Sequence, residues 1–120
     1  MDYNYPHIRT VYEHLLTHPD EHDQGTWAKC VAGHAVRLSG SDWTLVRDSR
    51  KHVDGSEVTN MRTGELRDIE DVAAELLGMD ITQARGLFAT DNRIAVDWLG
   101  DILAAHETIV LDQLAKEWAS

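Results

Sequence analysis

The stretch from Gln24 to Ala35, QGTWAKCVAGHA, constrains the fold more than any other part of the chain. It is typical of a helix, but most of its side chains are too small to fill space. The small side chains at Ala28, Ala32 and Gly33 allow another backbone segment to approach closely on one face. We therefore expect another part of the protein to pack tightly against this segment.

The same stretch places Cys30 one helical turn before His34, on one face. Thiolate and imidazole are donors that zinc prefers, and His18 with His22 would complete a set of four metal ligands. That spacing is not the spacing of a ligand knuckle, and Pro19 interrupts the upstream pair. We expect Cys30 to be a buried apolar residue and His34 to be satisfied by one hydrogen bond, with no metal and no cofactor bound. The four-ligand site remains the alternative.

A nucleophilic role for Cys30 would require a lowered thiol pKa and an accessible sulfur. A position in the middle of a helix rich in Ala and Gly offers neither. His14 and His18 share a helix face, but acidic neighbours indicate solvated surface groups. The chain shows no phosphate-binding glycine loop and no Ser-centred elbow. We therefore expect no catalysis, and a small metal- or thiol-dependent enzyme that uses Cys30 and His34 is the alternative.

Hydrophobic periodicity predicts two helices in the first third of the chain. Pro6 suits the first turn of a helix over residues 6–17, and Pro19 follows its end. A second helix is predicted from Thr26, as N-cap, to Leu38. The apolar stripe of the first helix consists of Ile8, Val11, Tyr12, Leu15 and Leu16.

Aromatic and β-branched runs over residues 43–47 and 57–61 predict two antiparallel strands, with a third near Leu66. Residues 48–56 are predicted to connect the first two. Asp68 then begins a third helix that Gly78 ends, and Asp80 begins a fourth. The fold class is α+β: a mainly helical domain with a small antiparallel sheet between the second and third helices.

From Arg93 onward the chain predicts one long C-terminal helix, with Gly100 as its only breaker. Its apolar residues spread over more than one face, which indicates contacts on two sides. We expect this helix to mediate association, either with a partner protein or in a homodimer. The predicted interface residues are Trp98, Ile102, Ile109 and Trp118.

Length and charge limit the classes of function. The 120 residues are the size of one domain, expected to span 1–120, and the net charge is −10. Such a charge opposes binding to nucleic acid, which depends on Lys and Arg. The single cysteine and an N-terminal sequence without a signal pattern predict a cytoplasmic protein. The lack of a long apolar run predicts that no segment spans a membrane.

Several short segments carry a family likeness, and together they cover somewhat over half of the chain. They are His18-Pro19, Gln24-Gly25-Thr26-Trp27, residues 30–35 (CVAGHA), residues 73–79 (AAELLGM), and residues 84–92, which contain Leu87-Phe88 and Asp91-Asn92. In their order and spacing the chain resembles a family of small uncharacterised proteins of actinobacteria and their phages. The resemblance implies a phage or actinobacterial cytoplasmic setting and brings no established activity.

Together these observations predict a small acidic interaction protein, phage-encoded, that binds a host protein and is not a catalyst. A second alternative, besides the enzyme, is an acidic mimic of nucleic acid that occupies a basic host protein. A charge of −10 on a small domain would steer such a partner.

Overall fold

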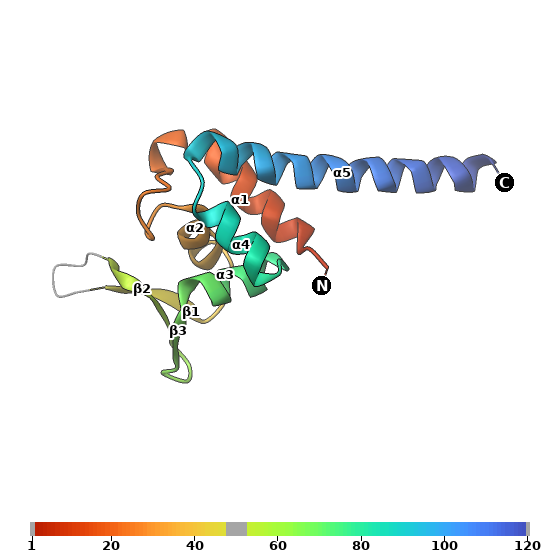
Figure 1. The fold of residues 1–120 in the computed structure, drawn as a ribbon. Helices are drawn as coiled ribbons and strands as arrows, with labels where there is room; N and C mark the ends of the chain where they lie inside the picture. Colours follow the sequence, from red (N-terminus) through yellow and green to blue (C-terminus); the bar gives the residue numbers. More distant parts are fainter. Residues whose placement is uncertain (1, 48–52, 120) are drawn as a thin grey trace.

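A computed structural model describes residues 2–47 and 53–119, and their arrangement confirms the α+β class (Figure 1). Helices and a three-stranded antiparallel sheet form a body, from which the last helix projects. The elements in chain order are α1 (Tyr5–Thr17), the 3-10 turn η1 (Pro19–Glu21), α2 (Val31–Arg37), β1 (Trp43–Arg47), β2 (Val53–Asn60), β3 (Leu66–Asp68), α3 (Ile69–Leu77), α4 (Ile81–Phe88) and α5 (Asn92–Ala119).

Helix α1 forms where the periodicity predicts it. Its N-cap, Asn4, accepts a hydrogen bond from the backbone N–H of His7, and Pro6 occupies the first turn. One face buries Ile8, Val11 and Leu15 in the core, and Tyr12 is partly buried beside them. Leu16, the last residue of the predicted stripe, is exposed, so the buried face is narrower than the sequence indicates.

Helix α2 begins at Val31, so the predicted start at Thr26 is wrong. The Thr26 carbonyl accepts from the backbone N–H groups of Lys29 and Cys30, which makes a single turn. Cys30 then adopts an extended backbone (ψ 175°), and this interrupts the helix before it restarts. The small residues are explained by that interruption. A Cβ on Gly33 would lie 2.1 Å from the carbonyl oxygen of Trp27, so the preceding turn itself packs against α2.

The sheet has the order β1-β2-β3 and is antiparallel throughout. Strand β2 begins at Val53, earlier than predicted, because its backbone pairs with Arg47 of β1 beyond an irregularity in the register. Of the predicted connection over residues 48–56, positions 48–52 lie outside the described residues, and 53–56 belong to β2. Val58 of β2 and Leu45 of β1 face the core.

Helices α3 and α4 begin at the predicted caps and α3 ends at the predicted Gly78, whereas α4 ends at Phe88, before Asp91-Asn92. The Asp68 carboxylate accepts from the N–H of Glu70, and the Asp80 carboxylate accepts from the N–H of Gln83. Gly78 ends α3 in the left-handed conformation (φ 70°). The core lies between α1, α2, α3 and α4, and its largest buried side chains are Ile8, Leu15, Ile69, Leu77, Met79, Leu87 and Leu99.

Helix α5 is 28 residues long, and Asp91 caps it by accepting from the N–H of Ile94. Its first half lies along α1, where Ala95, Leu99 and Leu103 are buried. Its second half extends away from the body with no other element beside it (Figure 1). The molecule is consequently elongated, with extents of 61 × 31 × 24 Å. Among the described helices, none combines the length and hydropathy needed to span a bilayer.

Candidate functional site

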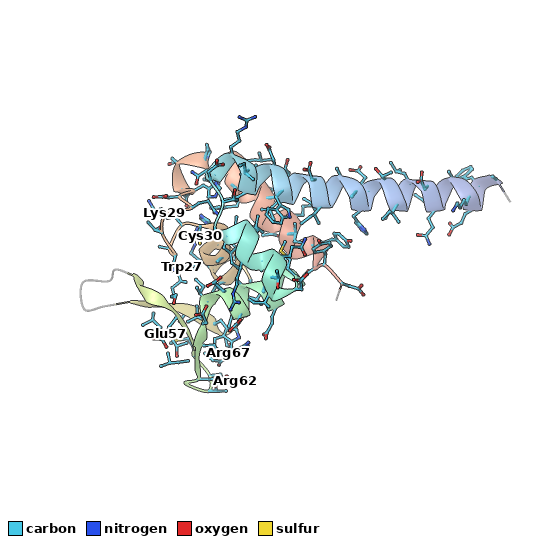
Figure 2. All side chains as sticks on the ribbon, in the orientation of Figure 1. Trp27, Lys29, Cys30, Glu57, Arg62 and Arg67 are labelled. Carbon is cyan, nitrogen blue, oxygen red and sulfur yellow. The ribbon has the colours of Figure 1, made fainter. Side chains whose placement is uncertain are left out.

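The second half of α5 is the part of the molecule whose side chains the fold uses least. The ring of His106 stacks on Tyr5 of α1, with 3.6 Å between ring centroids. Beyond this contact, every residue from 107 to 119 is exposed. We call residues 107–119 the projecting segment. Figure 2 shows its side chains pointing outward on all sides of the helix.

The four predicted interface residues divide between the two halves of α5. Trp98 and Ile102 are partly buried against the core, and the Trp98 ring lies over Gly86 of α4. Ile109 and Trp118 lie on the projecting segment, where their side chains are 61% and 88% exposed. The fold therefore uses the first pair within the chain and leaves the second pair available for a contact.

Apolar residues recur on one side of α5 in both halves, with Glu107 on the same side between them. With 100° between successive residues, Val110 and Leu114 lie on the same side of α5 as the buried Leu103. Leu111 and Trp118 lie next to them, toward one edge of this side. We call Val110, Leu111, Leu114 and Trp118 the α5 stripe. Sequence reasoning named only Trp118 of these residues as interface, although their helical spacing was the signal that could have identified all four.

Acidic residues accompany the α5 stripe. Glu107 lies on the same side of the helix, before the stripe begins, and Glu117 lies at the margin of that side, while Lys116 lies on the opposite side. The face available to a partner is therefore apolar with negatively charged residues on the same side of the helix.

The thiol of Cys30 is buried, as the sequence predicts, with 1% of the residue exposed. Desolvation raises its pKa, and the charge of Glu70 adds to this, while backbone hydrogen bonds oppose it. The sulfur lies 3.8 Å from the Trp27 carbonyl oxygen. Cys30 and Trp27, labelled in Figure 2, are among the residues that line a pocket of about 350 Å³. Glu70 and Arg85 lie at this pocket and approach each other to 3.6 Å. A protonated, buried thiol is a poor nucleophile.

Both ring nitrogens of His34 have protein partners. Nε2 donates to the carbonyl oxygen of Glu21 at 2.8 Å, and Nδ1 accepts from the Arg37 guanidinium at 2.6 Å. Burial lowers the pKa of His34, the hydrogen bond to the Glu21 carbonyl opposes this shift, and the nearby charges of Arg37 and His14 add to it. His34 therefore makes two hydrogen bonds where the sequence predicts one. It has no lone pair left to serve Cys30 as a base or a metal as a ligand.

The alternative metal set of His18, His22, Cys30 and His34 is not assembled as ligands. His22 has its Nε2 engaged by the Gln24 side-chain oxygen at 2.9 Å. Among the described residues, the group that brings three ligand atoms within 4.8 Å of one another contains His18 but not the other three.

Gln24 and Asn92 join the segment before α2 to the connection between α4 and α5. The Gln24 side-chain oxygen accepts from the N–H of Val31, at the start of α2, and its amide donates to the carbonyls that end α4, such as Phe88. Asn92 accepts from the N–H of Gln24 and donates to the carbonyl of His22. These hydrogen bonds serve the fold, so the two side chains are used without a ligand.

Comparison with known proteins gives no family for this chain. It matches no protein-family model, no curated protein and no solved structure.

Proposed function

We propose that this chain is a non-catalytic interaction protein that binds its partner through the α5 stripe. The observation that carries the proposal is the exposure of this apolar face. Leu111, Leu114 and Trp118 are 58%, 45% and 88% exposed on a segment that the body does not cover. Burying one such side chain stabilises a complex by roughly 1.5–3 kcal/mol before association costs are counted.

The physics of helices supports the same proposal. Packing of an apolar face supplies most of the stability of a helix in a protein. The projecting segment, residues 107–119, continues a packed helix but has its own apolar face in solvent. A partner that covers the α5 stripe would supply the missing packing.

We infer that the partner is a protein with an apolar groove and basic side chains beside it. Glu107 lies on the side of the stripe, and the whole chain carries a charge of −10, so two copies would repel each other at this face. The likeness to proteins of actinobacteria and their phages supports a host protein as the partner and the host cytoplasm as the setting. A homodimer is the competing arrangement.

A pair of polar substitutions in the stripe tests the proposal. The double variant Leu114→Ser, Trp118→Ser should fold as the wild type does, because both side chains are exposed. It should lose the proteins that the wild type retains from an actinobacterial lysate. Ile94→Ser is the matched control, since Ile94 is 51% exposed but lies on the body. Retention that is equal for all three proteins would contradict the proposal.

Two further measurements on the same proteins separate the alternatives. Sedimentation should show a monomer for the wild type, whereas a dimer that the double variant abolishes would establish self-association in place of a host partner. If the chain is an acidic mimic of nucleic acid, the retention of host proteins would fall steeply with salt concentration. The two substitutions would not change this retention, because it would depend on charge alone. Retention through the stripe should depend on the substitutions and fall less steeply with salt.

A further inference from the structure

We propose that His14, His18 and Glu21 form a binding site for a divalent transition-metal ion of the Zn²⁺ type. The site lies where α1 ends and η1 begins, away from the α5 stripe, and it does not depend on the proposed function. The expectation of no metal was based on a different set of residues, and His14 with His18 was expected to be a solvated pair. The structure brings Glu21 to that pair.

The backbone explains why three ligands meet here. His14 and His18 are four residues apart on α1, and their rings stack with 4.6 Å between centroids and 17° between planes. Pro19 then ends the helix, and the 3-10 turn over Pro19–Glu21 reverses the chain. This turn returns the Glu21 carboxylate to the two imidazoles.

The distances suit a shared ion. The Nε2 atom of His14 lies 3.6 Å from Oε1 of Glu21, which is long for a hydrogen bond. Two ligands bound to one tetrahedral Zn²⁺ at the usual bond lengths lie about 3.4 Å apart. All three ligand atoms lie within 4.8 Å of one another. Because a lone pair lies in the plane of its ring, the exposed His18 ring must rotate out of its stack on His14 to face the same ion.

His14 supplies a second, independent observation. Its Nε2 atom is shielded from solvent and has no hydrogen-bond partner among the described residues. A buried imidazole nitrogen without a partner is costly unless something binds it. An ion between His14 and Glu21 would satisfy both groups at once.

Hydrogen bonds from neighbouring residues orient His18 and Glu21 as metal ligands. The Thr17 hydroxyl donates to the Glu13 carbonyl, so its oxygen accepts from Nδ1 of His18 at 2.9 Å and leaves Nε2 of His18 as the metal donor. His34 donates to the Glu21 carbonyl and so fixes the backbone that carries the carboxylate. Two imidazoles and one carboxylate form a ligand set that zinc accepts, with a fourth position open to water or to a partner's side chain.

Titration of the full chain, without an affinity tag, with Zn²⁺ tests the site. We expect one equivalent to bind and to raise the melting temperature, because the ion ties η1 to α1. His18→Gln and Glu21→Gln should each weaken binding by about tenfold or more. His106→Gln is the matched control, since it removes a histidine from α5 and leaves the site intact. Co²⁺ should give visible absorption that the first two variants lose.

The absence of a bound equivalent would overturn the proposal, as would binding that both His18→Gln and Glu21→Gln retain. Binding that His106→Gln weakens equally would also overturn it, because it would show chelation by scattered surface histidines. The melting temperature of each metal-free variant establishes that it is folded. His18 is exposed and Glu21→Gln preserves shape, so folded variants are expected.

Discussion

The body and the projecting segment of α5 use their side chains in opposite ways. In the body, the unusual residues of the sequence serve the fold: Gly33 admits the turn at Trp27, Gln24 joins α2 to α4, and Cys30 fills the core. In the projecting segment, large apolar side chains contribute nothing to the core and face solvent. The comparison teaches that a distinctive sequence pattern can reflect packing alone, while a plain helical repeat can leave an apolar face in solvent.

The largest effect expected in the body comes from placing a charge at Cys30. Cys30→Asp should lower the free energy of unfolding by about 3–5 kcal/mol, because the carboxylate would be buried without a partner. Cys30→Ser should cost less, since the hydroxyl can donate to the Trp27 carbonyl as the thiol does. Chemical denaturation of both variants measures the difference.

Labelling of the folded wild type with a thiol reagent provides the complementary measurement. The reaction should be slow without denaturant and fast in the unfolded chain. Fast labelling of the folded protein would show that Cys30 is accessible, and it would favour the alternative of a thiol-dependent enzyme.

A smaller effect is expected at the close approach between Gly33 and the preceding turn. Gly33→Ala should cost about 2–3 kcal/mol, because the added methyl group would meet backbone atoms that cannot move independently. Gly25→Ala is the control. The atom nearest to a Cβ added at Gly25 is Oδ1 of the flexible Asp23 side chain, at 3.0 Å. Equal melting temperatures for Gly33→Ala and the wild type would refute the tight packing of α2 on its own preceding turn.

The smallest effect is expected from an ion pair on the surface of the body, between Arg67 and Glu75. Arg67 of β3 makes two hydrogen bonds to the Glu75 carboxylate, at 2.6 and 2.8 Å, and these bonds lower the pKa of Glu75. The pair therefore adds stability above the ordinary pKa of 4.5, and that stability is lost as the pH falls through the lowered value.

Because Glu75 is more than half exposed, the pair should contribute only about 0.5–1 kcal/mol. Glu75→Gln should lower the unfolding free energy by that amount at pH 7, and the difference should shrink as the pH falls below 4.5. A difference between the two proteins that does not change with pH would show that packing, and not charge, is the cause.

Local chemistry made most of the fold predictable. The caps at Asp68 and Asp80, the left-handed Gly78 and the period of α1 each act within a few residues, so the sequence alone reveals them. The start of α2 could not be predicted in the same way. Thr26 does begin a turn, but a tertiary contact from Gln24 caps the helix at Val31 instead.

The candidate sites follow the same division. The sequence identified Ile109 and Trp118, because apolar excess on a helix is visible from spacing. It did not identify where α5 leaves the body, since that depends on the length of α1 and on the Tyr5–His106 stack. The meeting of His14 with Glu21 was equally hidden, because it depends on how η1 turns.

Hydrogen exchange along α5 in the isolated protein tests the central claim most directly. The claim predicts strong protection around Leu99 and Leu103, where α5 is packed, and fast exchange over residues 107–119 in a monomer. Addition of a partner should protect that segment and leave the rest of α5 unchanged. Uniform protection of α5 in a monomer, at every protein concentration, would contradict the claim, because the projecting segment would then be stable without any partner.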